Sequence, residues 1–254
     1  MYSPSLISSL RAPENLNFSY EPDGRHGRQL ERVSFRVEPG ETVALVGHTG
    51  AGKSTIAKLI ARFYDPTGGR LTIDGVDLRD VTQSSLRSQL GIVPQEGFLF
   101  AGTVRDNIAF GRPDASLEDV VAAARTVGAD EFVLELENGY DTQLGERGTR
   151  LSLGQRQLVA FARALLADPR VLILDEATSS VDIGTERKIE AALGRLLFAR
   201  TAFIIAHRLS TIRSADLIVV LEHGRIVEQG SHAELMERGG LYMSLYGDWA
   251  ETAA

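Results

Sequence analysis

A glycine-rich stretch in the first quarter of the chain carries a lysine and two hydroxyl side chains at a fixed spacing. Gly47, Gly52, Lys53 and Ser54 satisfy the spacing Gly-x-x-x-x-Gly-Lys-Ser/Thr, and Thr55 follows directly. Backbone N–H groups can wrap phosphate oxygens where the chain lacks a Cβ and takes positive φ. A lysine supplies a cation for β- and γ-phosphates, and a serine hydroxyl is a ligand for Mg²⁺. The stretch therefore predicts a binding loop for a nucleoside triphosphate.

The residues on both sides of this phosphate loop (residues 47–55) predict the elements that hold it. Residues 43–46 form an apolar run, and residues 56–63 carry apolar side chains at helical spacing. A strand would enter the loop and a helix would leave it, so that the first N–H groups of the helix and its dipole face the phosphates. The alternative is an ordinary glycine-rich turn, which would not need Lys-Ser-Thr in this frame.

Two carboxylates follow another buried strand. Residues 171–174 are all apolar, and Asp175 and Glu176 come next. Carboxylates at the end of a buried strand cost free energy unless a cation lies nearby, and nucleotide-bound Mg²⁺ is such a cation. We expect Asp175 to serve Mg²⁺ and Glu176 to polarise a water for attack on the γ-phosphate. The alternative is a pair of acids that simply face solvent.

A second predicted helix start also suits a phosphate. Ser152 is a good N-cap residue, Gly154 leaves the backbone open, and helical spacing continues to residue 166. Taken alone, this pattern predicts a capped helix and nothing more. Its meaning depends on the phosphate loop and the two carboxylates that accompany it.

Composition excludes several classes of function. The net charge of −7 and the pI of about 5.3 give no sign of a nucleic-acid binder. The chain has no cysteine, which rules out disulfides and thiolate metal sites and fits a cytosolic protein. The longest apolar runs are only a few residues, whereas a membrane-spanning helix needs about 20. The N-terminus has no signal-peptide pattern.

The N-terminal third is expected to contain short antiparallel strands. Residues 1–14 are rich in Ser and Pro, and we expect a leader or linker there rather than part of the fold. Residues 15–20 alternate like a half-buried strand. Asp74-Gly75 between residues 71–73 and 76–78 is a strong hairpin signal.

The remainder alternates buried strands with helices, which predicts an α/β fold. Strands are expected at residues 90–94, 171–174, 201–206, 217–221 and 225–228. Helices are expected at residues 117–127, 129–136, 152–166 and 185–197, and Ser231 with Glu234 opens a terminal helix. We therefore expect one domain over residues 15–254. Its core would cover about residues 15–95 and 157–254, and a helical insertion subdomain would cover about residues 96–156.

From residue 15 to residue 246 the chain resembles the nucleotide-binding domain of an ABC transporter (ATP-binding cassette). Seven elements match in family order: an adenine-stacking aromatic, Walker A, Q-loop, signature, Walker B, D-loop and switch histidine. In that order they are Tyr20, residues 47–54, Gln95, residues 151–155, residues 171–176, residues 180–182 and His207. Residues 95–108 and 144–148 are further similar to the exporter-type pattern. Leu153 departs from the usual glycine of the signature, and we expect activity to survive this change.

The resemblance implies a P-loop NTPase core with a mixed or parallel sheet, an N-terminal antiparallel β subdomain and a helical subdomain. It also implies ATP and Mg²⁺ as cofactors and a role for each matching residue. Glu176 would be the general base, His207 would contact the γ-phosphate and Gln95 would sense Mg²⁺ or the attacking water. Ser54, Gln95 and Asp175 would serve the metal. The nucleotide-binding residues would be Tyr20, Gly47, Thr49, Gly50, Ala51, Gly52, Lys53, Ser54, Thr55, Ser152, Gly154, Gln155 and Asp182.

The resemblance further implies an assembly. Two such domains would pair head to tail, with each ATP between one phosphate loop and the partner's Ser152, Gly154 and Gln155, and with Asp182 linking the two sites. The chain, itself soluble, would act at the cytoplasmic face of a membrane through a transmembrane domain, either fused upstream or a separate chain. No nucleic acid partner is expected. The transported substrate, its direction and the choice between homodimer and heterodimer stay open.

Two other functions compete with an exporter motor. A soluble ABC-type switch that binds DNA or ribosomes usually carries long insertions and basic surfaces, whereas residues 96–150 are few and the net charge is −7. A P-loop kinase would not need a signature, a D-loop and a switch histidine together.

Overall fold

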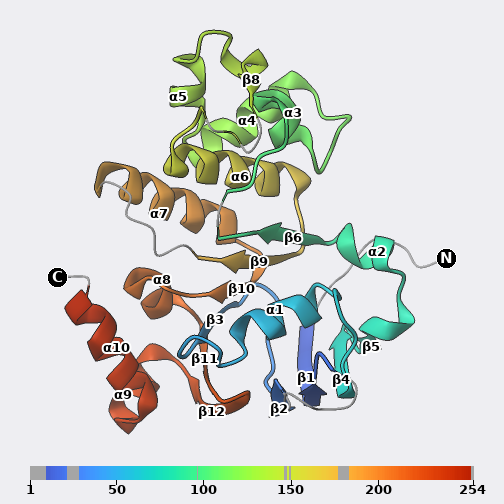
Figure 1. The fold of residues 1–254 in the computed structure, drawn as a ribbon, viewed down its shortest axis with the longest axis vertical. Coiled ribbons are helices and arrows are strands. Elements are labelled where there is room, and N and C mark those ends of the chain that lie inside the picture. The colour runs from blue at the N-terminus through green and yellow to red at the C-terminus, as the bar shows by residue number, and fades with distance from the viewer. Residues whose placement is uncertain are drawn as a thin grey trace. The chain divides into compact units, whose positions relative to one another are not determined.

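The computed structural model describes residues 10–21, 29–95, 97–145, 148, 150–176 and 183–252. The chain divides into two compact units, Met1–Leu90 with Arg200–Ala254, and Gly91–Ala199. Figure 1 shows the strands and helices that build each unit. Within the described ranges, no helix is both long and apolar enough to cross a membrane.

The first unit contains an antiparallel sheet with the strand order β2-β1-β4-β5. Its strands are β1 (Leu10–Phe18), β2 (Leu30–Val33), β4 (Gly68–Ile73) and β5 (Val76–Asp77). The predicted hairpin is confirmed: Ile73 pairs with Val76 across Asp74 and Gly75, whose φ angles are +53° and +79°. Two positive φ angles in a row give a turn whose twist matches that of the strands, which explains the Asp-Gly pair.

The leader expected over residues 1–14 is wrong for its last part. Strand β1 begins at Leu10, and Leu10 pairs with Ile73 of β4. The register shifts between Arg11 and Glu14, around Pro13, which has no N–H to donate to a ladder. Strand β1 is extended by pairing with the backbone of β4, which is distant in the sequence, so the local periodicity does not predict it.

The other sheet part of the first unit has the strand order β12-β11-β3-β10. Strand β3 (Thr42–Val46) lies parallel to both β10 (Thr201–Ile205) and β11 (Leu217–Glu222). Strand β12 (Arg225–Gly230) pairs antiparallel with β11. The three parallel strands read as continuous apolar runs because both of their faces are covered. This is the predicted mixture of parallel core strands and antiparallel N-terminal strands.

Helices of the first unit follow the strands. Helix α1 (Lys53–Ile60) leaves the loop after β3, and α8 (Leu209–Ser214) follows β10. Shorter elements after β5 are a 3₁₀ turn, η1 (Leu78–Asp80), and helix α2 (Gln83–Arg87).

The predicted terminal helix is two helices rather than one, α9 (His232–Arg238) and α10 (Leu241–Thr252). Ser231 and Glu234 form the expected capping box at the start of α9. Gly239 ends α9 with φ +65°, a left-handed C-cap that glycine adopts readily. Both carboxylate oxygens of Glu228 then accept from the first N–H groups of α10, at 3.0 Å from Leu241 and 2.9 Å from Tyr242. The break is therefore stabilised by a residue of β12.

The second unit has two hydrogen-bonded neighbouring strands, β6 (Leu90–Val93) and β9 (Val171–Asp175), and a group of helices. The longest helices are α6 (Leu153–Ala167) and α7 (Ile183–Leu197), and α4 spans Leu117–Val127 as predicted. Helix α6 contacts α3, α4 and α7. Shorter elements are α3 (Val104–Ala109), α5 (Asp130–Leu134), η2 (Gly139–Asp141), β7 (Gly102–Thr103) and β8 (Gln143–Leu144).

Candidate functional site

The phosphate loop follows β3 with positive φ at each of its glycines, +142° at Gly47, +83° at Gly50 and +109° at Gly52. A Cβ on Gly47 would lie 2.2 Å from the carbonyl oxygen of Leu221, and one on Gly52 would lie 2.7 Å from Leu30 Cδ2. Glycine is thus required both by conformation and by the close approach of neighbouring elements. The loop is therefore held in one backbone shape, with the Ala51 N–H donating to the His48 carbonyl oxygen at 3.1 Å.

Lys53 lies at the end of this loop with its ammonium folded back over it. Lys53 Nζ donates to the carbonyl oxygens of Gly47 at 2.7 Å and His48 at 3.0 Å, and the residue is only 8% exposed. Ser54 is exposed, whereas Thr55 is buried. A cation fixed over the loop and an accessible hydroxyl beside it are the two groups that a triphosphate with Mg²⁺ requires.

The N-terminus of α1 is left open by the residue that precedes it. Its N-cap is Gly52, which has no side chain for capping, and its first turn contains no acid. By contrast, Ser152 and Ser231 cap α6 and α9 with their hydroxyls. The unsatisfied N–H groups and the positive dipole end of α1 therefore favour an anion at this point.

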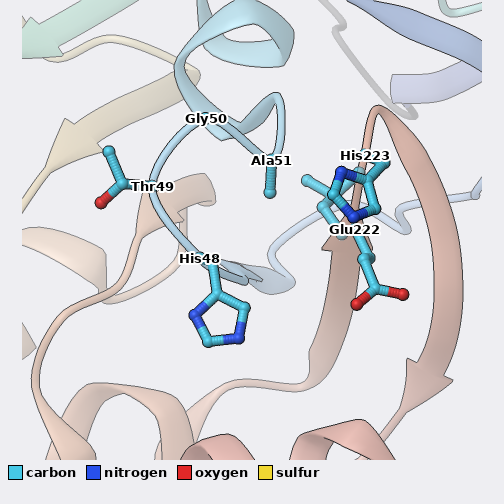
Figure 2. A pocket seen from close by; sticks show the side chains of 7 residues that line it. His48, Thr49, Gly50, Ala51, Glu222 and His223 are labelled. Atoms are coloured by element: carbon cyan, nitrogen blue, oxygen red, sulfur yellow. The ribbon is translucent and has the colours of Figure 1, made fainter.

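The turn between β11 and β12 braces the phosphate loop. Gly224 donates its N–H to the carbonyl oxygen of Ala51 at 3.1 Å. Figure 2 shows the pocket between the two segments, with His48 on the loop and His223 beside Glu222 on the turn. The pocket is lined by His48, Thr49, Gly50, Ala51, Leu221, Glu222 and His223. Among the residues that the structure describes, no three His, Asp or Glu side chains gather where they could hold a metal ion.

Tyr20 lies close to the phosphate loop. Its hydroxyl is 3.3 Å from Thr55 Oγ1, and its N–H donates to Gln29 Oε1 at 3.0 Å. The ring is 40% exposed. An exposed aromatic ring tied to the start of α1 has the position that stacking on the base of a bound nucleotide requires; the role itself stays a prediction.

His207 lies in the same unit, at the same sheet edge as the loop. Strands β3 and β10 are parallel, and the N–H of Ala206 donates to the Leu45 carbonyl at 3.3 Å. The chain therefore leaves β10 toward His207 where it leaves β3 toward Gly47. His207 is exposed there, and its contact with a γ-phosphate stays a prediction.

The carboxylates and Gln95 belong to the second unit. Asp175 ends β9 and is half-buried, and Glu176 follows with only 5% of its surface exposed. Gln95 is exposed, two residues beyond the end of the neighbouring strand β6. Asp182 and the rest of the predicted D-loop lie outside the described residues. The catalytic and metal roles of these residues stay predictions.

Helix α6 begins at the predicted cap. Ser152 Oγ accepts from the N–H of Gln155 at 3.2 Å, and Gln155 Oε1 accepts from the N–H of Ser152 at 2.9 Å. Because Ser152 accepts through its oxygen, its hydroxyl hydrogen can still be donated to a phosphate, as can the amide hydrogens of Gln155. Gly154 is buried in the first turn, and Leu153 beside it is half-buried.

A half-buried arginine that no sequence motif predicts connects α6 to the segment after Gln95. Arg163 donates to the carbonyl oxygens of Asn107 at 2.8 Å and Phe98 at 2.9 Å, and to Asn107 Oδ1 at 2.9 Å. Asn107 is 1% exposed and donates in turn to the carbonyl oxygens of Phe100 and Thr103. Burial lowers the pKa of Arg163 to about 10, so it stays charged at neutral pH. The signal was a charged residue inside an apolar helical run.

The same arginine lies beneath two exposed aromatic rings. Phe100 stacks on Phe110 with centroids 4.2 Å apart, and the Arg163 guanidinium lies 5.3 Å and 5.8 Å from the two centroids. Upstream, a Cβ on Gly97 would lie 2.7 Å from the carbonyl carbon of Arg156. The segment after Gln95 is therefore packed against α6 at two points, one turn and three turns from its start.

Comparison with known proteins identifies close relatives. The family model described as ABC transporter matches residues 30–179. The uncharacterized ABC transporter ATP-binding protein YknV of Bacillus subtilis (strain 168) is 56% identical over 232 residues, which cover 91% of this chain and 38% of the relative. The putative multidrug export ATP-binding/permease protein YgaD of the same organism is 51% identical over 233 residues, which cover 92% of this chain and 40% of the relative.

A solved structure agrees in fold. The structure of a bacterial Atm1-family ABC exporter with ATP bound superimposes with a TM-score of 0.87 and 48% identity, and the match covers 97% of this chain and 42% of that one. The α/β fold with its antiparallel β part is thus that of an ABC exporter's ATP-binding region. The chain spans about two fifths of the length of the proteins that it matches.

Proposed function

This chain belongs to the ABC transporter family, and from that membership we propose that it binds and hydrolyses ATP to drive export across a membrane. The observation that carries the proposal is the phosphate loop. Lys53 is folded onto the carbonyl oxygen of Gly47 at 2.7 Å, directly before a helix whose N-cap, Gly52, has no side chain. The cation and the N-terminus of α1, which no side chain caps, together suit a triphosphate.

The residues present also fit Mg²⁺. A magnesium ion bound with a nucleotide needs few protein ligands, because phosphate oxygens and waters fill most of its octahedral shell. The exposed hydroxyl of Ser54 supplies one such ligand, with Gln95 and Asp175 as the proposed partners. When bound, the ion would neutralise charge on the β- and γ-phosphates.

In the proposed mechanism, Tyr20 stacks on the base, and Gly47, Thr49, Gly50, Ala51, Gly52, Lys53, Ser54 and Thr55 hold the phosphates. Glu176 is proposed as the general base. It follows the last residue of β9 and is 5% exposed, within a part of the chain that excludes most water. His207 would donate to the γ-phosphate, and Gln95 would orient the attacking water.

Ser152, Gly154 and Gln155 are proposed to act on the ATP of a second copy or a related domain. The capping box leaves the Ser152 hydroxyl hydrogen available as a donor at the N-terminus of α6. With ATP between two such domains arranged head to tail, loss of the γ-phosphate would remove contacts that close the pair. Asp182 would connect the two sites.

We further propose that the motion drives a transmembrane domain at the cytoplasmic face of a membrane. The support is the pair of relatives above, one of which is named an ATP-binding/permease protein, together with the share of their length that this chain spans. The transport path would be formed by a transmembrane domain that corresponds to the part of the relatives this chain does not match. The substrate would be set by that domain.

Replacement of Glu176 by Gln tests the proposal. The variant keeps the shape of the side chain and loses its basicity, so ATP affinity should persist while turnover falls by roughly 100-fold or more. Phosphate release measures the turnover, and gel filtration with ATP should detect a dimer that persists in the variant.

Glu118→Gln is the matched control, because Glu118 is an exposed carboxylate at the start of α4. It should retain the turnover of the unmodified protein. Near-normal turnover in Glu176→Gln would remove Glu176 as the base, and no ATP binding by the unmodified protein would refute the proposed function as a whole.

A further inference from the structure

Three aromatic rings meet beside the start of α1. The centroids of Phe18 and Tyr20 are 4.9 Å apart, those of Tyr20 and Tyr64 are 5.1 Å apart, and those of Phe18 and Tyr64 are 5.6 Å apart. Tyr20 is nearly perpendicular to both neighbours, with interplanar angles of 85° and 84°. These are the edge-to-face arrangements that aromatic rings prefer.

The three rings differ in burial, which gives them different tasks. Phe18, in β1, is 2% exposed and belongs to the core, whereas Tyr20 and Tyr64 are 40% and 44% exposed. Because Tyr64 remains 44% exposed, burial of its side chain contributes little to the stability of the fold. Its ring contact with Tyr20 instead restricts the orientation of the Tyr20 ring.

Tyr20 is held at its hydroxyl and at its ring, where Phe18 and the Lys58 ammonium, 5.6 Å from the ring centroid, also make contacts. Its hydroxyl lies 3.3 Å from Thr55 Oγ1, which ties the far end of the ring to α1. Tyr64, which follows α1 in the sequence, packs against the ring itself. A ring held at its tip and its side keeps one orientation, and an aromatic face that is already oriented binds a base without losing side-chain entropy.

We propose that Tyr64 is a positioning residue that holds the Tyr20 ring in the orientation for stacking on the base of a nucleotide. The inference rests on the proposed function. It assigns to Tyr64 the part of the ATP affinity that depends on the base. Tyr64 acts through its ring, because its contact with Tyr20 is a ring contact. It acts on the base and not on the phosphates, whose loop is built by Lys53 and the glycines.

The neighbouring aromatic residue supplies a contrast. Phe63 is 55% exposed, and the Arg87 guanidinium lies 5.8 Å from its ring centroid. Phe63 and Tyr64 are thus adjacent exposed aromatic residues after the same helix, α1. Tyr64 is the one that contacts Tyr20. Phe63→Leu is therefore a matched control for loss of an aromatic ring at this place.

Calorimetric titration with two probes, ATP and inorganic tripolyphosphate, tests the proposal. Tyr64→Leu and Tyr64→Met should bind ATP about three- to tenfold more weakly, the range expected for one edge-to-face ring contact. Tyr64→Phe should restore the affinity, since it keeps the ring, and Phe63→Leu should keep it too. Tripolyphosphate has no base, so all four variants should bind it as the unmodified protein does.

Two results would overturn the proposal. One is ATP affinity in both Tyr64→Leu and Tyr64→Met equal to that of the unmodified protein. The other is a parallel loss of tripolyphosphate and ATP in both variants, which would mean that Tyr64 supports the fold and not the base. Failure of the proposed function looks different: the unmodified protein would bind neither probe, and this inference would fall with it.

Discussion

The Lys53 ammonium donates a 2.7 Å hydrogen bond to the carbonyl oxygen of Gly47, six residues earlier in the chain. Gly47 is the residue with which the loop leaves β3, and Lys53 is the first residue of α1. The contact therefore joins the two ends of the phosphate loop. It also keeps a positive charge over the loop, where phosphate oxygens would lie.

Replacement of Lys53 by Ala should weaken ATP binding on the order of 100-fold, because one charge-assisted hydrogen bond contributes about 1.5–3 kcal/mol. Calorimetry at micromolar ATP should then detect no binding. Lys188→Ala removes a lysine from α7, where its ammonium pairs with exposed Glu131, and should leave ATP affinity unchanged. An unaltered affinity in Lys53→Ala would refute the role assigned to the loop.

Substitutions of two glycines in the loop can distinguish the cost of a steric clash from the cost of an unfavourable backbone conformation. A Cβ on Gly47 would lie 2.2 Å from the Leu221 carbonyl oxygen, whereas a Cβ on Gly50 would meet nothing within 4 Å. Both residues have positive φ, +142° and +83°. Gly50→Ala should therefore cost about 1 kcal/mol for the left-handed conformation, and Gly47→Ala clearly more, because strand β11 must also move.

Thermal unfolding of the two variants measures this difference. Gly47→Ala should lower Tm further than Gly50→Ala and should also weaken ATP binding, since the turn after β11 braces the loop through Gly224 and Ala51. Equal losses in the two variants would mean that conformation alone decides the cost, and that the close approach of Leu221 has no effect.

Local signals in the sequence predicted most elements because those elements depend on neighbours in the chain. Helix α4 spans Leu117–Val127 as predicted: Ser116 and Asp119 form a capping box at its start, and Gly128 ends it with φ +75°. The hairpin at Asp74 and Gly75 and the cap at Ser152 follow from equally local chemistry. The candidate loop was also predictable, since its function needs specific residue types at fixed spacing.

What the sequence did not predict depends on contacts between distant residues. Leu10 joins β1 because Ile73 pairs with it, and α10 begins where Glu228 accepts its first N–H groups. Arg163 bonds to Asn107, which lies 56 positions away in the chain. Tyr64 meets Tyr20 only once β1 and α1 are side by side. No periodicity or motif in either partner encodes such a pair.

Replacement of Arg163 by Gln should destabilise the protein by about 2–3 kcal/mol, because three hydrogen bonds from a charged group are lost and the Phe98 and Asn107 carbonyl oxygens lose their donor. Arg163→Lys should restore only a part, since a single ammonium cannot reproduce the planar fork of the guanidinium. Urea unfolding followed by circular dichroism measures both. Arg170→Gln, at an exposed position after α6, should change little. Full rescue by lysine would mean that charge and not geometry matters.

The capping box of α3 makes stability depend on pH. Asp106 Oδ2 accepts from the N–H of Thr103 at 2.9 Å, and this backbone hydrogen bond, followed by one with the Thr103 side chain, lowers the pKa of Asp106 below 3.8. A lowered pKa in the folded state means that the ionised carboxylate contributes stability above pH of about 4, and that this contribution is lost as pH falls through the folded value.

Asp106→Asn should therefore lower the urea midpoint at pH 7 slightly and reduce the loss of stability between pH 7 and pH 3, because the titrating group is gone while the amide oxygen can still accept from Thr103. Asp114→Asn is the matched control, as Asp114 is exposed in the segment before α4 and outside any capping box. It should keep the acid-side slope of the unmodified protein. If Asp106→Asn and Asp114→Asn change that slope equally, the effect comes from net charge and not from the cap.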